Sequence, residues 1–232
     1  MKLSLVIPVY NEENKIADTL AECCSELDKS FDDYEIIIVN DGSSDRSADK
    51  VKQLAYPKVK MISYKKNRGK GYAVRRGVLV SSGDVICYTD ADLAYGADII
   101  KPMTDALESC GADLVIGSRK DTEDGYGGYP PLRKAASRVY SDMVRLASGV
   151  SYDTQCGIKC FRKDIGRLLF ALMKTDTYAF DTEVIMIAEK MNLKIKEYPV
   201  KIMNHSDSHV NIVRDSAVML KDMLRIRHRI KK

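Results

Sequence analysis

Short apolar runs alternate along the chain with longer segments in which hydrophobic side chains recur at a helical spacing. The runs predict buried strands, and the spaced segments predict amphipathic helices. The predicted strands cover residues 3–9, 35–39, 59–64, 84–89, 113–118, 155–161 and 194–203. The predicted helices cover residues 12–27, 69–82, 99–109, 132–148, 164–173 and 180–191, with one more after the turn at 41–45. This alternation predicts one α/β domain over residues 1–210, in which helices flank a doubly wound, Rossmann-like and mostly parallel sheet.

The pattern of residues 211–232 predicts a separate element, a basic amphipathic helix. Val213, Ala217, Leu220 and Leu224 recur at helical spacing, and Lys and Arg side chains crowd the final turns. Such a helix can lie on an anionic membrane surface, where basic residues are attracted to the lipid headgroups. The alternative is that it packs against the domain or against a partner chain, so the formation of a homo-oligomer stays open.

Composition and charge narrow the class of protein. The 37 Lys and Arg residues nearly balance the 33 Asp and Glu residues, and a net charge of +4 gives no general reason to expect a nucleic-acid partner. No run approaches the roughly 20 apolar residues that span a bilayer, and the first nine residues are too short for a secretory signal. The six cysteines form no CxxC pair, which is typical of reduced thiols. We expect a cytoplasmic protein that works at the cytoplasmic face of a membrane.

Two carboxylates follow directly after the strand predicted at 84–89. Asp90 and Asp92 would leave the sheet at the carboxyl end of this strand, where open α/β sheets bind their ligands. Neighbouring carboxylates repel each other unless a cation shares them, and a hard divalent cation with oxygen ligands is the ordinary solution. Because such a cation also binds phosphate, the first hypothesis is a nucleotide-diphosphate substrate.

Polar side chains also follow the first two predicted strands, in segments 8–12 and 40–45. The carboxyl ends of these strands should lie beside Asp90, so that one ligand could contact all three. The alternative for Asp41 and Ser44 is that they only cap the next helix. Two glycines and two cations in segment 67–71 open another helix, whose backbone N–H groups and dipole would favour an anion.

Residues 120–131 interrupt the alternation. They show no period and contain three glycines and two prolines. Such a segment predicts a loop, and a loop beside a ligand-binding edge often acts as a lid. The alternative is a plain surface excursion.

Seven motifs occur in a characteristic order, namely VIPVYNE, VNDGSSD, NRGKGYAVRRG, YTDADL, GSR, DTQCGIKCF and YAFDTEV. In these motifs the chain resembles the inverting family 2 glycosyltransferases with the GT-A fold, over residues 3–210. It is most similar to the branch that makes polyprenyl-phosphate sugars, which includes the dolichyl-phosphate β-glucosyltransferases. DTQCGIKCF and YAFDTEV are the specific parts of the resemblance. It implies a hexosyltransferase that moves glucose from UDP-glucose to a dolichyl or other polyprenyl phosphate.

The resemblance also implies a role for each matching residue. The nucleotide-sugar donor would contact Pro8, Tyr10, Glu12, Asp41, Lys70 and Asp90. Asp92 would be the direct ligand of Mg2+ or Mn2+, and Asp90 would lie near the ribose or in the metal shell. Phosphates of donor and acceptor would meet Arg119, Arg133, Arg138 and Ser208, although a solvated helix face is the alternative for the arginines. The sugar and the acceptor would lie along Gln155, Lys159, Asp181 and Glu183, with Asp92, Asp181, Glu183 and Arg119 as the catalytic group.

The chain departs from the family pattern at two places. Mannosyl-type relatives carry a metal-binding glutamine two positions beyond the second aspartate, whereas this chain has Ala94, which favours glucosyl-type transfer. Where relatives often read serine-lysine, this chain reads Ser208-His209, so a positive contact to phosphate would depend on protonation of His209. His205 is either a late metal ligand or a surface histidine.

The acceptor decides which catalytic groups are needed. A lipid monophosphate has a second pKa of about 6 and is largely a dianion at neutral pH, so it is already a nucleophile. A sugar hydroxyl would instead need a general base, for which Asp181 or Glu183 is the candidate. A transferase for hydroxyl acceptors in polysaccharide or cell-envelope synthesis is therefore the main alternative. A nucleotidyltransferase and a non-enzymatic scaffold at a membrane surface are the other two.

Overall fold

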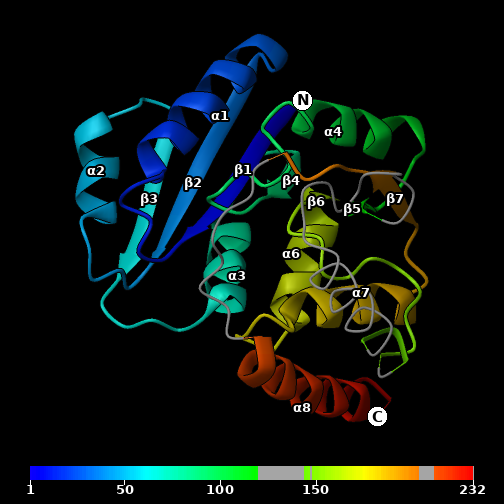
Figure 1. The fold of residues 1–232 in the computed structure, drawn as a ribbon. Coiled ribbons are helices and arrows are strands. Elements are labelled where there is room, and N and C mark those ends of the chain that lie inside the picture. The colour runs from blue at the N-terminus through cyan, green and yellow to red at the C-terminus, as the bar shows by residue number, and fades with distance from the viewer. Residues whose placement is uncertain (120–143, 147, 204–211, 232) are drawn as a thin grey trace.

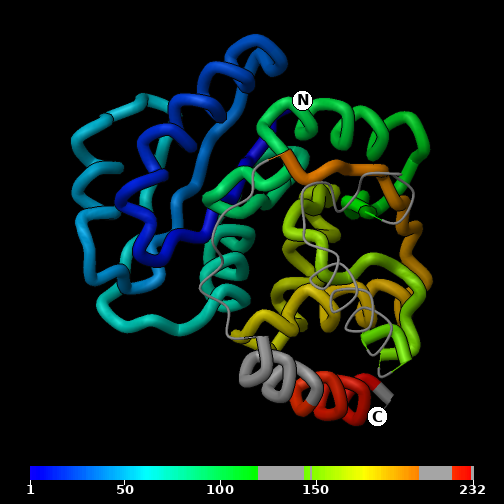
Figure 2. Tube along the Cα trace, in the orientation of Figure 1, coloured from blue at the N-terminus to red at the C-terminus, as the bar shows by residue number. Residues whose placement is uncertain are grey.

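A central sheet organises the protein (Figure 1). The structure is a computed structural model that describes residues 1–119, 144–146, 148–203 and 212–231. The strands of these residues are β1 (Lys2–Val9), β2 (Asp33–Asp41), β3 (Val59–Tyr64), β4 (Val85–Tyr88), β5 (Leu114–Ser118), β6 (Lys159–Arg162) and β7 (Ile195–Pro199). They form one seven-stranded sheet in the order β3-β2-β1-β4-β6-β5-β7. The first half of the chain therefore supplies the strands at one end of this order, and the second half supplies those at the other end, as the tube in Figure 2 also shows.

Helices cover both faces of this sheet. They are α1 (Ile16–Ser30), α2 (Ser47–Leu54), α3 (Lys70–Val80), α4 (Ile100–Ser109), α6 (Lys163–Leu172), α7 (Phe180–Lys190) and α8 (Ile212–Lys231). One apolar core lies between the sheet and α1, α2 and α4, and a second lies between the sheet and α3, α6 and α7. The last helix, α8, lies against α7 and reaches the second core through Ile226. The domain thus has three layers, helix, sheet and helix, as predicted for a Rossmann-like sheet.

The alternation of side chains along the strands explains why both faces are apolar. In β1, Leu5 and Ile7 enter the first core, while Val6 between them enters the second. In β4, Cys87 enters the first core and Tyr88 the second. Successive side chains of a strand point to opposite faces, so a strand buried on both sides reads as a continuous apolar run. That is the pattern from which these strands were predicted.

One strand differs in direction from the others. β6 is antiparallel to both of its neighbours, β4 and β5, whereas β1 runs parallel to β2 and β4. An apolar run has the same appearance in either direction, so the sequence could not reveal this reversal. Because Lys159 at the start of β6 pairs with Tyr88 at the end of β4, the segment before β6 arrives at the ligand-binding edge. The predicted strand at 155–161 begins only at Lys159 for the same reason, since residues 153–157 belong to that edge.

Other predicted boundaries moved by a few residues. The first helix begins at Ile16 rather than residue 12, because residues 13–15 form a turn in which the Lys15 N–H donates to the Glu12 carbonyl at 3.0 Å. The last strand ends at Pro199, short of the predicted 203. The loop at 120–131 and most of the helix at 132–148 lie outside the described residues. In the described part of the chain, no helix combines the length and apolar character needed to cross a bilayer.

A buried carboxylate ties the strands together at the edge of the sheet opposite the predicted ligand edge. Glu35 of β2 accepts hydrogen bonds from the Ser4 hydroxyl, from the N–H and hydroxyl of Ser82, and from Lys60 Nζ, at 2.7 to 2.8 Å. Burial alone would raise the pKa of Glu35, but the bonds from Lys60 and the two serines outweigh it and lower the pKa to about 2. The ionised carboxylate therefore joins β1, β2, β3 and the turn after α3.

Replacing Glu35 by Gln should lower the free energy of unfolding by about 1–3 kcal/mol at pH 7, because charge-assisted hydrogen bonds are lost. The pKa of Glu35 is lower in the folded state than its ordinary value of 4.5. Its contribution is thus complete above pH 4.5 and is lost as the pH falls toward 2. Urea unfolding at pH 7 and pH 3 should show a smaller deficit at pH 3, and the exposed control Glu108→Gln should show none. An equal deficit at both pH values would contradict this assignment.

Candidate functional site

The carboxyl ends of β2, β1 and β4 lie side by side because these strands are parallel neighbours. The segments that follow β1 and β2 are also bonded to each other. Asn11 N–H donates to Ser43 Oγ at 3.0 Å, and Ser44 N–H donates to Asn11 Oδ1 at 2.8 Å. Glu12 N–H donates to Ser47 Oγ at 2.8 Å. These hydrogen bonds join residues 11–12 and 43–47 into one surface, which we call the wall after β1 and β2. Beside it, Pro8 is half-buried and Tyr10 is 48% exposed.

Asp41 holds the start of α3 and does not cap α2. Its two carboxylate oxygens accept the backbone N–H groups of Arg68 at 2.8 Å and Gly69 at 2.9 Å. Asp45 instead bonds to the N–H and hydroxyl of Ser47 at the start of α2. The helix-capping alternative for Asp41 and Ser44 is thus corrected, because the Asp41 carboxylate is engaged by the next loop.

The start of α3 is also less open to an anion than segment 67–71 suggested. The N–H groups of Gly71 and Tyr72 donate to the Asp176 carbonyl, at 2.9 and 3.3 Å. Together with the two N–H groups bonded to Asp41, four backbone donors at this helix start have protein acceptors. The expectation of a backbone anion site is therefore corrected. The positive charge that this element brings to the site is the Lys70 ammonium.

Lys70 and Asp90 form an ion pair at the centre of the edge. The Lys70 Nζ lies 2.5 Å from Asp90 Oδ1, and their side chains are 18% and 32% exposed. Burial would lower the pKa of Lys70, but the charges of Asp90 and Asp181 outweigh it and raise that pKa above its ordinary range. Lys70 therefore stays charged at the mouth of the site, where a diphosphate could reach it.

Asp92 lies two residues beyond Asp90 and is half-buried. Its Oδ1 accepts the Ala94 N–H at 3.2 Å. Within the described residues, no cluster of three or more His, Cys, Asp and Glu side chains could hold a metal ion alone. Mg2+ is commonly bound by one or two carboxylates, with substrate phosphates and water completing its shell. Asp92 and Asp90 fit that kind of donor set.

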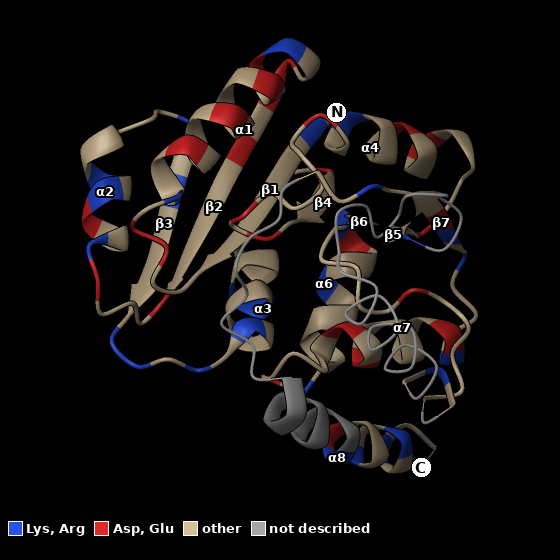
Figure 3. Cartoon of the chain, in the orientation of Figure 1, with Lys and Arg blue, Asp and Glu red and all other residues tan. Residues whose placement is uncertain are grey.

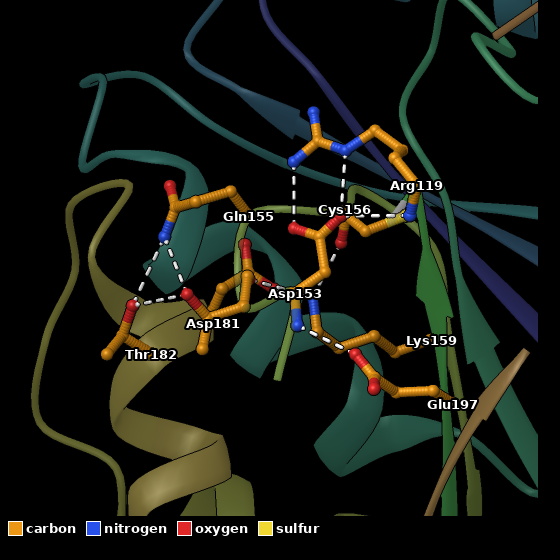
Figure 4. A network of polar contacts seen from close by, with 9 residues as sticks. Arg119, Asp153, Gln155, Cys156, Lys159, Asp181, Thr182 and Glu197 are labelled. Atoms are coloured by element: carbon orange, nitrogen blue, oxygen red, sulfur yellow. Dashed lines mark hydrogen bonds and ion pairs between the residues drawn. The ribbon is translucent and has the colours of Figure 1, made fainter. Parts of the chain in front are cut away.

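Lys159 and Asp181 form a buried ion pair beside the segment 153–157 (Figure 4). The fully buried Lys159 Nζ lies 2.6 Å from Asp181 Oδ1 and donates to the Cys156 and Thr154 carbonyls, at 2.6 and 3.3 Å. The Tyr88 hydroxyl donates to the same Asp181 oxygen. Burial and the charge of Asp181 raise the pKa of Tyr88 far above its ordinary value, so the phenol keeps its proton. The pair joins β4, β6, α7 and the segment 153–157.

Arg119 fixes the beginning of the same segment. Its Nε and Nη2 lie 2.9 and 2.8 Å from the two oxygens of Asp153, in a bidentate pair that Figure 4 shows. Burial opposes ionisation of Asp153, but the pairing with Arg119 outweighs it and lowers the pKa of Asp153. The Asp153 N–H donates to Glu197 of β7 at 2.9 Å. If Arg119 contacts a phosphate, as predicted, it does so with a guanidinium that is already paired with Asp153.

Gly157 brings this segment against the acidic motif. A Cβ atom at position 157 would lie 2.2 Å from Asp90 Oδ2, closer than any real side chain could approach. With the Asp90 carboxylate in this position, only glycine leaves room for the backbone to pass it. Gln155 in the same segment donates from its amide nitrogen to the hydroxyls of Thr154 and Thr182, at 3.1 and 3.2 Å.

Glu183 is bonded to the loop before α7 and to α8. One of its oxygens accepts the N–H groups of Lys174 and Thr175, at 3.2 and 2.8 Å, and the other is paired with Arg229 of α8. The side chain is 1% exposed. Both oxygens of Glu183 are thus bonded to the loop before α7 and to α8, and its role as a base stays a prediction.

Five residues named in the sequence analysis belong to segments that the structure does not describe. Arg133, Arg138, Ser208, His205 and His209 lie outside the described residues. Conversely, Tyr88, Asp153 and Gly157 belong to the site but were not singled out from the sequence. The feature of the sequence that could have pointed to them is that Tyr88 lies in the motif YTDADL, and Asp153 and Gly157 lie in DTQCGIKCF.

Comparisons with known proteins show the family of the chain. The model of the family "Glycosyl transferase family 2" matches residues 4–169. Dolichyl-phosphate β-glucosyltransferase ALG5A of Trichomonas vaginalis is 34% identical over 238 residues, covering 97% of this chain and 72% of that protein. ALG5C of the same organism is 32% identical, covering 90% of this chain and 66% of that protein. The Homo sapiens dolichyl-phosphate β-glucosyltransferase is 29% identical, covering 98% of this chain and 75% of that protein. This chain thus spans roughly two thirds to three quarters of the length of these relatives.

Solved structures share the fold. Glucosyl-3-phosphoglycerate synthase from Mycobacterium tuberculosis, in complex with Mn2+, UDP and glucosyl-3-phosphoglycerate, matches with a TM-score of 0.73 at 19% identity. The match covers 98% of this chain and 80% of that one. Mannosyl-3-phosphoglycerate synthase from Rubrobacter xylanophilus matches with a TM-score of 0.71 at 19% identity, over 99% of this chain and 73% of that one. At this identity the likeness establishes the GT-A fold predicted from the motifs.

Replacing Lys159 by Met should lower the free energy of unfolding by about 3–5 kcal/mol, because a buried carboxylate loses its cation. The exposed control Lys196→Met on β7 should change it by less than about 0.5 kcal/mol. Adding Asp181→Leu to Lys159→Met should recover part of the loss, since removing both charges costs less than removing one. Chemical denaturation measures all three variants. A loss below about 1 kcal/mol for Lys159→Met alone would show that the pair does not support the site.

Proposed function

The chain belongs to glycosyl transferase family 2, and we propose that it transfers glucose from UDP-glucose, with inversion, to a dolichyl or other polyprenyl phosphate. One observation carries the proposal. Lys70 is paired with Asp90, two residues before Asp92, at the carboxyl edge of a GT-A sheet, in a chain about 30% identical to dolichyl-phosphate β-glucosyltransferases. Two carboxylates with one ammonium suit a nucleoside diphosphate together with a divalent cation.

The donor occupies the side of the site built by the first half of the chain. The uracil and ribose lie along the wall formed after β1 and β2, next to Pro8, Tyr10 and Glu12, with Asp41 behind the loop that leads into α3. The exposed ring of Tyr10 offers a surface on which a base can stack. The diphosphate lies over Lys70 and Asp92. Asp92, with Asp90 nearby, would hold Mg2+ or Mn2+, which would supply positive charge to stabilise the departing UDP.

The acceptor occupies the side built by the second half of the chain, near Gln155 and Asp181. A lipid phosphate dianion attacks the anomeric carbon in line with the departing UDP, which gives a β-linked product from an α-linked donor. No base is needed, because this nucleophile carries its charge already. The contacts of Asp181 support this choice over a hydroxyl acceptor. The oxygen shared by Lys159 and Tyr88 serves to orient the segment beside the sugar, rather than to remove a proton.

A peripheral membrane contact completes the proposal. The carboxyl-terminal half of α8 carries several basic residues, which are coloured blue in Figure 3. Next to them Leu224 is 58% exposed and Leu146 is 82% exposed, and Arg227 reaches the Leu146 carbonyl. Exposed leucines among basic residues suit the interface of an anionic bilayer. We assign this membrane contact to the helix of residues 211–232, on a transferase domain of residues 1–210.

In a transfer assay, the full chain with UDP-glucose, Mn2+ and a short polyprenyl phosphate should form a glucosylated lipid phosphate. The rate should fall as the pH drops below about 6, because the acceptor phosphate becomes protonated. The matching polyprenyl alcohol serves as the control acceptor and GDP-mannose as the control donor. Transfer to the alcohol but not to the phosphate, or release of pyrophosphate, would contradict the proposal.

The variant Asp92→Asn tests the assignment of the cation. It should lower kcat/KM by roughly 100-fold to 1,000-fold, the usual effect of losing one group that stabilises transition-state charge. The free energy of unfolding should stay within about 0.5 kcal/mol of the wild type. Asp105→Asn, at an exposed position of α4, is the matched control and should leave kcat/KM unchanged. Equal activity of both variants would place the cation elsewhere.

A further inference from the structure

The loop between α6 and α7, residues 174–177, lies between the terminal helix and the donor side of the site. On one side the Asp176 carbonyl accepts the N–H groups of Gly71 and Tyr72 in the first turn of α3. The Asp176 carboxylate is paired with Arg75 one turn later, at 2.7 Å. The loop therefore holds α3 at the turn that carries Lys70.

The contact between loop and helix leaves no room for a side chain. A Cβ atom at Gly71 would lie 2.6 Å from the Thr175 carbonyl oxygen and 2.7 Å from Phe180 Cβ. Backbone packed directly on backbone transmits small displacements, because neither surface can adapt by changing a rotamer. A shift of the loop must therefore move the first turn of α3.

On its other side the loop is held by Glu183. The N–H groups of Lys174 and Thr175 donate to one oxygen of this carboxylate. The other oxygen is paired with Arg229 of α8, whose guanidinium also donates to Thr175 Oγ1 at 3.3 Å. Glu183 is 1% exposed and Arg229 is 37% exposed. A buried carboxylate needs its counter-charge, so Arg229 determines how firmly Glu183 holds the loop.

The terminal helix also contacts the loop directly. Thr177 Oγ1 donates to Asp222 of α8 at 2.8 Å. On the same helix Met223 and Ile226 are buried against the domain. Both ends of the loop are thus bonded to α8, either directly or through Glu183.

We propose that Arg229 is a positioning residue for the donor site, acting through Glu183 and the loop 174–177 on the first turn of α3 and hence on Lys70. The contacts form one continuous path from α8 to Lys70, and each step is a hydrogen bond, an ion pair or direct backbone packing. Docking of α8 on the domain therefore favours binding of a nucleoside diphosphate. This inference deepens the proposed function and rests on it for the identity of the ligand.

Two variants of α8 separate this role from a general effect of basic charge. Arg229→Ala removes the partner of Glu183. Arg225→Ala, one turn earlier, removes an equal charge whose side chain is 66% exposed and is paired only at 3.6 Å with Asp222. In hydrogen-exchange measurements on the full chain, the amides of Gly71 and Tyr72 should exchange faster in Arg229→Ala and at the wild-type rate in Arg225→Ala. Arg229→Lys should restore part of the protection.

Binding and kinetics test the consequence for the donor. The Kd of UDP measured with Mn2+ should rise about 2-fold to 30-fold in Arg229→Ala, and the KM for UDP-glucose should rise with it. The KM for the lipid phosphate and kcat should stay unchanged, which a general loss of stability would not produce. Unaltered exchange at Gly71, or equal effects of the two alanine variants, would overturn the inference. If the wild type binds no UDP, the proposed function fails, and hydrogen exchange alone decides whether α8 positions α3.

Discussion

The buried ion pair between Lys159 and Asp181 is the interaction on which the geometry of the site depends. Lys159 is fully buried, and its ammonium draws together a carboxylate of α7 and two carbonyls of the segment before β6. Neither charge could be buried without the other, because an uncompensated charge in the interior costs several kcal/mol. The pair thus fixes the path of residues 153–157. Within this segment, Gly157 packs directly against Asp90.

The reversed strand explains how two halves of the chain contribute to one edge. The parallel strands β2, β1 and β4 deliver the segments that follow them, including Asp90 and Asp92. β6 runs the other way, so it delivers the segment that precedes it. The proposed nucleotide side and the proposed acceptor side are thereby built from different parts of the sequence and meet at β4. Tyr88, the last residue of β4, is bonded to the Asp181 carboxylate of the buried pair.

The sequence predicted the fold well where the evidence for an element is local. Strands buried on both faces appear as apolar runs, and the motif carboxylates at the end of β4 lie where open α/β sheets bind ligands. It did not predict contacts that depend on pairing between distant segments. The direction of β6, the engagement of Asp41 by the loop before α3 and the burial of Glu183 under α8 all arise from tertiary packing. Nothing in the local pattern of these residues distinguishes a carboxylate that serves a ligand from one that holds a loop.

A crystal structure of the full chain with UDP and Mn2+ would test whether the Lys159–Asp181 pair sets the geometry of the site. The cation should lie between Asp92 and the diphosphate, with Lys70 beside the phosphates. Lys159 should remain on Asp181, with the 153–157 segment unmoved against Asp90. If Lys159 instead left Asp181 to contact the nucleotide, or if the cation lay away from the Asp90 and Asp92 pair, the ion pair would not be the foundation of the site.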